Sequence, residues 1–224
     1  MKKRNNVALT KQQKSILIGT LLGDGHLNKR GSNVRLQIVH GPAQEEYIKW
    51  KYDNLKDLCT DRGLKYNKYT DRNSKSGVKY CWDFYTQHHE FLTFLHNLLY
   101  SPNKQINEQI LDRLDPLALA VWIMDDGSLQ KRKGKPRLDG RQKYAGARFV
   151  ICTYSKNLEI EKLIIKKLKE KFNLTFKIQR HYDNYRIYCT TQDFKKLSSI
   201  VAPYVHPSMN YKIDTSFLGQ FVSS

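Results

Sequence analysis

The sequence predicts an α+β protein made of two copies of an αββαββα domain, related by a pseudo-twofold axis, each with a four-stranded antiparallel sheet. The first observation is a repeated motif, LIGTLLGDG at 17–25 and LAVWIMDDG at 119–127, in which an apolar run ends at an acid followed by glycine. The second is that strand and helix patterns follow both motifs in the same order. The third is a match within strands, VRLQI at 34–38 and ARFVI at 147–151. A repeat of half the chain length indicates a duplicated domain.

The first copy begins with a helix. Thr10 and Gln13 fit a capping box, and helical residues continue to about Leu22. Later segments show the period-two pattern of strands or the near-3.6 period of helices. In chain order they are strands at 26–31 and 34–40, a helix from 43 to about 62, strands at 65–70 and 79–86, and a helix at 88–99.

The second copy begins at Asp115, which suits an N-cap followed by Pro116 at the first helical position. The segments after this motif helix are predicted as strands at 128–133 and 147–153, a helix at 156–172, strands at 175–181 and 185–190, and a helix at 192–201. The predicted domains are 1–99 and 115–224, joined by a linker at 100–114.

The bulk composition favours a folded nucleic-acid-binding protein. Hydrophobic residues make up 40% and aromatic residues 12% of the chain, which is enough for a packed core. Lys and Arg number 39 against 21 Asp and Glu, and the net charge of +18 predicts a polyanionic partner.

The sequence shows no membrane span, no secretory signal and no cysteine motif. Apolar runs are too short for a membrane span, and the basic N-terminus lacks a secretory apolar region. We therefore expect no membrane partner and an action where the protein is synthesised, in an organelle (mitochondrion or chloroplast) or a bacterial or phage cytoplasm. The four cysteines form no CxxC pair, so we expect reduced, structural thiols.

The two acids require an explanation. If the motif helices pack on each other about the pseudo-twofold axis, Asp24 and Asp126 emerge side by side and repel unless a cation lies between them. Mg²⁺, with Mn²⁺ as a substitute, suits such oxygen ligands, and the backbone carbonyls of Gly23 and Asp125 could complete its shell. Acids before glycine could also be ordinary helix ends, but an acid has the unfavourable charge at a helix C-terminus. Its occurrence at both equivalent positions favours a metal site that hydrolyses phosphodiesters.

The two motifs resemble those of the LAGLIDADG homing endonucleases, and the αββαββα order extends this resemblance over nearly the whole chain. The resemblance implies a single-chain monomer whose two sheets form a saddle on double-stranded DNA. It implies Mg²⁺-dependent cleavage of both strands of a long site across the minor groove, leaving 3′ overhangs. The acid found one position earlier in the interface helix of some members is replaced here by Leu22 and Met124.

Site residues follow from the resemblance by position. Asp24 and Asp126 would be the metal-binding carboxylates, and Lys104 and Lys212 match the basic residues that follow the last helix of each half. His40 and Thr153 end the second strand of each half, where a water-positioning role and a purely structural role both remain open.

The expected DNA contacts lie on alternate strand residues, because successive side chains point to opposite faces. In VRLQI, Arg35 and Gln37 share one face; arginine suits guanine and glutamine suits adenine, although phosphate contact is the commoner role for any one of them. Candidates on the later hairpins are Lys79, Lys177, Gln179, Arg186 and Tyr188. The basic segment 129–148 is expected to follow the DNA backbone through Lys131, Arg132, Lys133, Lys135, Arg137, Arg141 and Arg148.

Other functions remain alternatives. An intron maturase of the same fold would bind intron RNA, and a non-cleaving transcription regulator would commonly lack the acids. A basic ribosomal-type protein would explain the charge but not the acids, and the histidine spacings fit no HxH or HExxH metal site. No flanking splicing motif is visible, so we expect a free-standing or intron-encoded protein rather than an intein.

Overall fold

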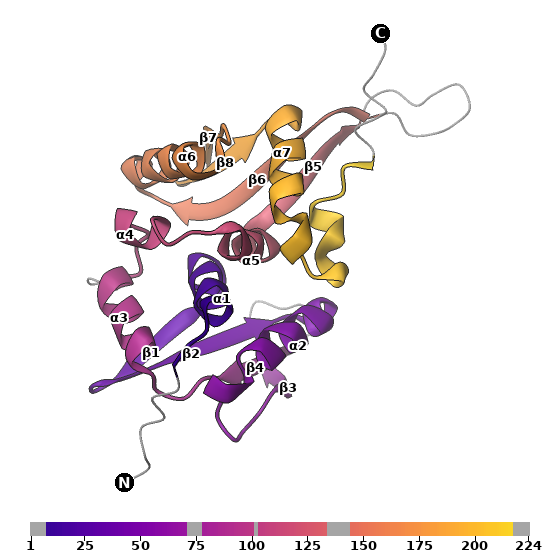
Figure 1. Ribbon diagram of the computed structural model, residues 1–224. Helices are drawn as coiled ribbons and strands as arrows, with labels where there is room; N and C mark the ends of the chain where they lie inside the picture. The colour runs from indigo at the N-terminus through magenta and orange to yellow at the C-terminus, as the bar shows by residue number, and fades with distance from the viewer. Residues whose placement is uncertain (1–7, 71–77, 101–102, 134–143, 217–224) are drawn as a thin grey trace. The chain divides into compact units, whose positions relative to one another are not determined.

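The computed structural model describes residues 8–70, 78–100, 103–133 and 144–216. The chain divides into two compact units, Met1–Gln105 and Ile106–Ser224. Each unit holds one four-stranded antiparallel sheet with its helices (Figure 1). No helix among the described residues is both long and apolar enough to cross a membrane.

The first unit follows the predicted order. Thr10 caps the first helix, since its side chain accepts from the Gln13 amide at 3.1 Å and the Gln13 side chain accepts from the Thr10 amide at 3.0 Å. Its strands lie in the order β1-β2-β4-β3. The elements are α1 (Lys11–Leu22), β1 (His26–Arg30), β2 (Asn33–His40), η1 (Pro42–Gln44), α2 (Glu45–Asn54), η2 (Lys56–Leu58), β3 (Lys65–Thr70), β4 (Val78–Tyr85) and α3 (Glu90–Leu99).

The second unit repeats this topology, with its strands in the order β5-β6-β8-β7. Its elements are α4 (Glu108–Leu111), α5 (Pro116–Asp126), β5 (Gly127–Lys133), β6 (Tyr144–Ser155), α6 (Leu158–Phe172), β7 (Lys177–His181), β8 (Asn184–Cys189), α7 (Thr191–Val201), η3 (Ala202–Tyr204) and η4 (Pro207–Lys212). The two matching sheets confirm the predicted duplicated α+β fold.

Strand register establishes which residues of the two units correspond. His26 pairs with Gln37 in the first sheet, and Ser128 pairs with Val150 in the second. These pairs occupy the same place in their sheets, one residue after the glycine that follows each motif acid. Asp24 and Asp126 are therefore equivalent positions, and Asp125 corresponds to Gly23.

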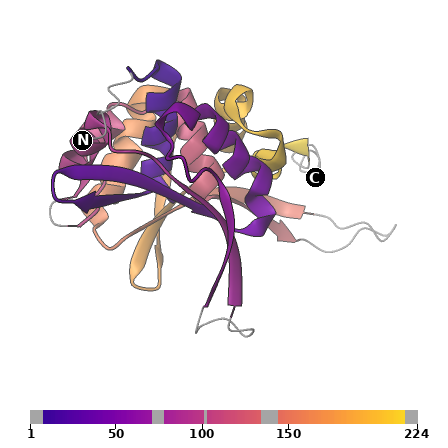
Figure 2. The ribbon, with the colours of Figure 1, turned by 90° about the horizontal axis from the view of Figure 1, so that it is seen from below.

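Each sheet buries one face against helices. In β2, Leu36 and Ile38 are fully buried while Arg35 and Gln37, which alternate with them, are partly exposed, as the alternation predicts. Helices α2 and α3 contact β2, and α6 and α7 contact β6 and β8. Figure 2 shows β3 and β4 running side by side as a long ribbon in the first unit. The partly exposed face of each sheet is thus available to a ligand.

Two elements differ from their predicted ranges by three residues or more at one end. The helix expected to reach Arg62 ends at Asn54, because the backbone at 58–60 bonds to the end of β4: the Thr60 amide donates to Tyr85 O, and the Gln87 amide donates to Leu58 O. The strand expected at 147–153 runs from Tyr144 to Ser155, since its pairing with β5 extends to Lys133.

The predicted linker contains a short helix, α4. The Asn107 side chain caps it by accepting from the Ile110 amide at 3.1 Å, and Ile110 is fully buried. The carboxylates of Glu108, at its start, and Asp112, just after its end, each lie 2.7 Å from the Lys167 ammonium on α6. Helix α4 is therefore packed within the second unit.

All four cysteines are free, as expected of structural thiols. Burial raises the pKa of Cys59 and of Cys189 to about 12, so both remain protonated thiols near neutral pH.

The glycine after each motif acid is required by close packing. A Cβ on Gly25 would lie 2.7 Å from the Thr20 carbonyl oxygen, and a Cβ on Gly127 would lie 2.5 Å from Ile123 O and from the Phe149 ring. Each strand leaves its helix immediately after the acid, and only glycine permits that approach. Neither glycine has a positive φ, so the constraint is steric contact rather than backbone conformation.

We expect Gly25→Ala and Gly127→Ala each to lower the free energy of unfolding by about 1–3 kcal/mol, because the added methyl overpacks the helix end. Gly41→Ala is the matched control, since nothing lies within 4 Å of its Cβ position and its φ is −68°. Urea unfolding monitored by circular dichroism measures all three variants. Stabilities equal to that of Gly41→Ala would contradict the packing account.

Candidate functional site

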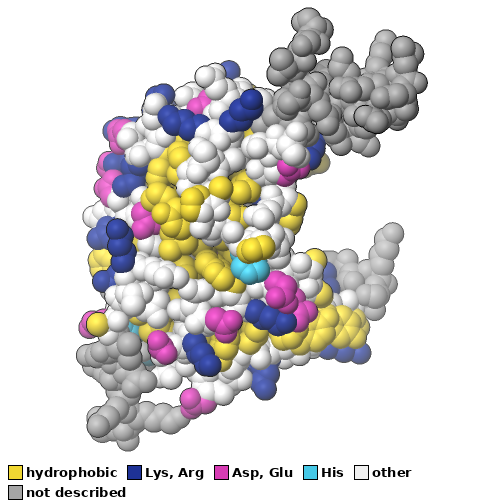
Figure 3. Space-filling view, turned by 45° about the vertical axis from the view of Figure 1, so that its right-hand side comes forward, with side chains coloured by type: hydrophobic (Ala, Val, Ile, Leu, Met, Phe, Trp, Pro, Cys, Tyr) yellow, Lys and Arg dark blue, Asp and Glu magenta, His cyan; other side chains and the backbone are white. Residues whose placement is uncertain are grey.

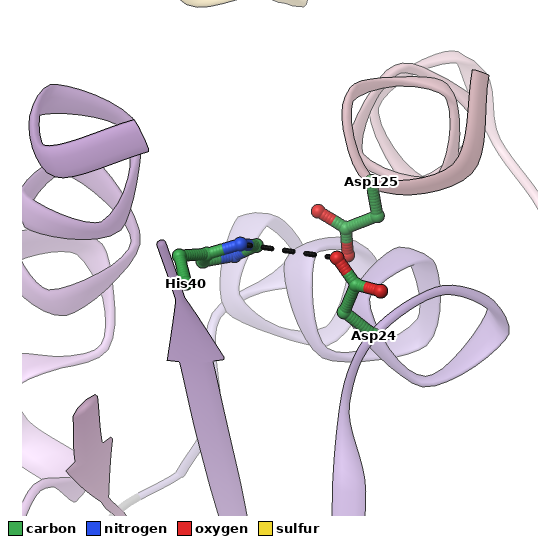
Figure 4. A group of neighbouring side chains, drawn as sticks. All are labelled: Asp24, His40 and Asp125. Carbon is green, nitrogen blue, oxygen red and sulfur yellow. Dashed lines mark ion pairs between the residues drawn. The ribbon is translucent and has the colours of Figure 1, made fainter. Parts of the chain in front are cut away.

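Asp24 stands where the polypeptide leaves α1. Its side chain is 44% exposed, and its Oδ2 lies 3.8 Å from Nδ1 of His40 (Figure 4). His40 ends β2 and is itself buried. The first unit thus presents an accessible carboxylate with an imidazole facing it.

Lys104 binds the backbone on both sides of Asp24. Its ammonium donates to Gly23 O at 2.9 Å and to Gly25 O at 3.1 Å. The carbonyls at a helix C-terminus carry partial negative charge, which disfavours an acid and attracts a cation. Lys104 therefore offsets the unfavourable position of Asp24.

Lys212 makes a comparable contact in the second unit, where Asp125 O is the acceptor equivalent to Gly23 O. Its ammonium donates to Asp125 O at 3.0 Å and to Met124 O, and only 8% of the residue is exposed. Asp125 and Asp126 are half-buried at the end of α5. Asp125 is the third residue labelled in Figure 4 and belongs to this second unit. Each lysine expected from the resemblance thus bonds the end of its own motif helix.

The carbonyls of Gly23 and Asp125, expected as metal ligands, are both lysine acceptors in the structure. A carbonyl oxygen has two lone pairs, so this hydrogen bond leaves one lone pair for a second partner. The metal role of these two carbonyls remains a prediction.

His40 and Thr153 occupy equivalent strand positions, although β6 continues to Ser155, and they have different surroundings. His40 Nδ1 lies 3.0 Å from Gln44 Oε1, and Nε2 lies 3.2 Å from the Lys51 ammonium. The Thr153 hydroxyl donates to Glu161 Oε1 at 2.6 Å. These contacts support a structural role for Thr153 and leave the water-positioning role of His40 as a proposal.

Two buried charged residues of this region were not predicted. Lys51 and Glu161 are both fully buried, on α2 and α6. Burial raises the pKa of the Glu161 carboxyl, and the hydrogen bond from Thr153 opposes that rise. A position on the apolar side of each helix is the sequence signal that could have identified them.

On the first sheet, two predicted DNA contacts lie beside one aromatic ring. The Arg35 guanidinium stacks over the Tyr85 ring at 4.5 Å, and the Gln37 amide donates to the Tyr85 hydroxyl at 2.8 Å. Lys79 is exposed on β4 and alternates onto the same face as Tyr85. These contacts hold both polar side chains on the exposed face.

The second sheet repeats the arginine–tyrosine pair. The Arg148 guanidinium lies 5.6 Å from the centre of the Tyr188 ring, and its Nε donates to Gln130 Oε1 at 2.9 Å. Cross-strand pairing puts Lys177 opposite Tyr188 and Gln179 opposite Arg186, so these predicted contacts share one face. Register makes Arg148 the equivalent of Arg35.

Several predicted contacts lie elsewhere. Lys131 alternates away from Gln130, onto the other face of β5, and its ammonium lies 3.3 Å from Asp214 Oδ2. Its contact with the DNA backbone remains a prediction. Arg132 and Lys133 end β5, where their backbones pair with Gly146 and Tyr144. The remaining predicted residues outside the described part of the chain are Lys135, Arg137 and Arg141.

Basic side chains are not gathered on every surface of the protein. Figure 3 shows a face on which Lys and Arg are interspersed with Asp and Glu. The net charge of +18 is therefore not spread over the protein as a uniform positive surface.

Known proteins resemble this chain over most of its length. "Protein RecA" of Mycolicibacterium chitae is 33% identical over 95% of the chain and 48% of its own length, and "Intron-encoded endonuclease ai4" of Dictyostelium discoideum is 33% identical over 59% of the chain and 76% of its own length. The chain spans about half the length of the RecA relatives that it matches.

A solved structure and a family match agree with the fold. The homing endonuclease I-WcaI bound to its DNA recognition sequence has a TM-score of 0.77 and 25% identity, over 93% of this chain and 88% of that protein. Residues 14–197 match the LAGLIDADG DNA endonuclease family. This match covers well over half of the sequence, and the chain therefore belongs to the LAGLIDADG DNA endonuclease family.

Proposed function

We propose that this chain is a site-specific, metal-dependent endonuclease that cuts both strands of a long DNA site across the minor groove and leaves 3′ overhangs. The observation that supports this proposal is an arrangement built twice: an acid followed by glycine, with a lysine ammonium bonded to the adjacent helix-end carbonyls. A family member kept only as a scaffold has no need to maintain both copies.

Asp24 and Asp126 are the proposed metal ligands, helped by the carbonyls of Gly23 and Asp125. The donors are all oxygen, which suits Mg²⁺ with Mn²⁺ as a substitute, and the 44% exposure of the Asp24 side chain leaves it accessible to an ion. A bound divalent ion would supply an activated water and neutralise charge at the phosphorus. This assignment requires the two units to bring their acids together, as in the proposed pseudo-twofold arrangement.

The lysines and His40 have distinct proposed roles. Each ammonium is hydrogen-bonded to a backbone carbonyl of a residue next to its motif acid. From there it can stabilise the negative charge that develops on a phosphate or leaving oxygen. The buried His40 faces Asp24 and is placed to orient the attacking water. These residues supply orientation and charge stabilisation without forming a covalent intermediate.

The exposed faces of the two sheets are the proposed DNA-binding surfaces. The DNA-bound state of the similar I-WcaI supports this proposal. Arginine that stacks on tyrosine keeps its guanidinium plane in a fixed orientation, which favours bidentate contact with guanine. We further propose that the protein works as a single-chain monomer where it is synthesised, in an organelle or a bacterial or phage cytoplasm.

The test is cleavage of a randomised duplex DNA library with Mg²⁺, alongside Ca²⁺ and EDTA controls, followed by sequencing of the ends. Reproducible ends with short 3′ overhangs at one long site are expected with Mg²⁺ only. Tight DNA binding without cleavage in Mg²⁺ or Mn²⁺ would contradict the proposal. Preferential binding of structured intron RNA would then favour a maturase.

Loss of either motif acid should prevent double-strand cleavage. We expect Asp24→Asn and Asp126→Asn each to slow cleavage by a factor on the order of 10³ or more, since several kcal/mol of charge stabilisation is lost. Asp125→Asn discriminates between the two neighbouring acids of the second motif, because strand register makes Asp126 the equivalent of Asp24. Single-turnover cleavage and DNA binding in Ca²⁺ measure the two effects separately. Full activity of Asp126→Asn together with an inactive Asp125→Asn would overturn this assignment.

Loss of either lysine should slow cleavage without preventing DNA binding. We expect Lys104→Met and Lys212→Met to reduce the single-turnover rate by about 10²–10³-fold, as for removal of one charge-stabilising donor. Lys49→Met is the matched control, because Lys49 is 43% exposed and its ammonium pairs with Glu45 and Glu46 of its own helix. Thermal unfolding must accompany the rates, since Lys212 is buried. Unchanged rates would remove both lysines from the mechanism.

Base-reading and phosphate-contacting residues should differ in their effects. We expect Arg35→Ala and Arg148→Ala each to relax the base preference at one position and to cost about 1–3 kcal/mol of binding. Lys79→Ala should weaken binding to all sequences alike and reduce the salt slope by about 1. Binding to a library of singly substituted target sites at several salt concentrations measures both. A uniform loss for both arginine variants would show that they contact phosphates instead.

A further inference from the structure

A buried lysine lies behind His40 in the first unit. Lys51 on α2 is fully buried, and its ammonium lies 3.2 Å from His40 Nε2 and 4.6 Å from the centre of the Tyr47 ring. Lysine is almost never fully buried without compensating partners. His40 and the Tyr47 ring are thus among the partners that compensate the burial of this ammonium.

The contact determines which nitrogen of His40 carries a proton. An ammonium has three donors and no acceptor, so Nε2 of His40 must accept, and the ring proton is then on Nδ1. Nδ1 lies 3.0 Å from Gln44 Oε1 and 3.8 Å from Asp24 Oδ2. The Nδ1 proton of His40 is therefore donated to Gln44 Oε1, on the side of the ring that faces Asp24 (Figure 4).

The second unit has a different pair at the equivalent place. Thr153 stands where His40 stands, and its hydroxyl donates to the buried carboxylate of Glu161. A hydroxyl that donates to Glu161 does not present that proton to the motif acid. The two units thus match in their motif acid and lysine. They differ in the buried pair near it, which is His40 with Lys51 in the first unit and Thr153 with Glu161 in the second.

We propose that Lys51 is a positioning residue for DNA cleavage: it holds His40 as the Nδ1–H tautomer facing Asp24, and it supports scission of only the strand whose phosphate lies at Asp24. This inference rests on the proposed endonuclease function. It adds an asymmetry between the two strands, because the second unit has no lysine–histidine pair at the equivalent position.

The first test needs no DNA. Nitrogen-15 NMR of the imidazole rings in the metal-free protein distinguishes the two tautomers, and His40→Gln identifies the His40 signals. The wild type should show His40 as Nδ1–H, and Lys51→Met should lose that preference. A wild-type Nε2–H tautomer, or an unchanged tautomer in the variant, would overturn the proposal whether or not the protein cuts DNA.

The second test resolves the two strands. With each strand of the target labelled at its end, Lys51→Met should slow cleavage of one strand by about 10- to 100-fold, the range for loss of an outer partner of a site residue. Nicked product should then accumulate, and Lys51→Arg should restore part of the rate because arginine keeps a charged donor. Equal slowing of cleavage of both strands would show that Lys51 has only a structural role and would overturn the proposal.

Controls separate this inference from general destabilisation. Lys167→Met removes a lysine that is 8% exposed in the second unit, and it should leave the ratio of the two strand rates unchanged. In a His40→Ala background, Lys51→Met should cause no further change in that ratio; an additional change would show that Lys51 acts independently of His40. Wild-type cleavage in the same assay tests the endonuclease proposal separately.

Discussion

The hydrogen bonds from one lysine ammonium to the carbonyls at the end of each motif helix are the interaction on which the candidate site depends. A helix C-terminus repels a carboxylate, yet both motif helices lead directly into an acid. Lys104 and Lys212 place a positive charge at these ends and bond the backbone beside the acid. The following glycine lets the strand pass within contact distance of the helix, so the acid stays at the point where helix and sheet meet. Charge compensation and steric fit together make an otherwise unfavourable carboxylate a stable part of the fold.

The duplication preserves some features and varies others. The acid, glycine, lysine and arginine–tyrosine pair recur at positions that strand register makes equivalent. The buried pair at the second strand of each unit does not recur. The first unit has His40 with the buried Lys51, and the second has Thr153 with the buried Glu161. Features shared by both units would serve a reaction that occurs once on each strand. Features unique to one unit allow the two reactions to differ in rate.

The sequence predicted elements whose ends are determined locally. Thr10 and Asp115 mark helix starts because their side chains accept from backbone amides three residues later. It failed where distant contacts decide the outcome: the helical spacing continues past Asn54, but the backbone there bonds to the end of β4.

The same distinction applies to the site. The repeated motif predicts Asp24, Asp126 and the two lysines as site residues. Lys51 was missed because surface exposure is the usual state of lysine and its partner His40 lies on another element, so its position on the apolar side of α2 was the one available signal. Composition also gave no sign that Lys131 and its strand neighbour Gln130 lie on opposite faces of β5. Charge density in a sequence does not reveal which face of a strand a residue occupies.

The central claim is that the motif acids are present for chemistry and not for stability. The most direct test is the free energy of unfolding of Asp24→Asn and Asp126→Asn, obtained by urea titration without metal or DNA. Removing a carboxylate from a helix C-terminus should leave stability within about 0.5 kcal/mol of the wild type or raise it. A loss of more than about 1 kcal/mol in both variants, the size expected when a helix cap is removed, would show that the acids are structural and would contradict this account.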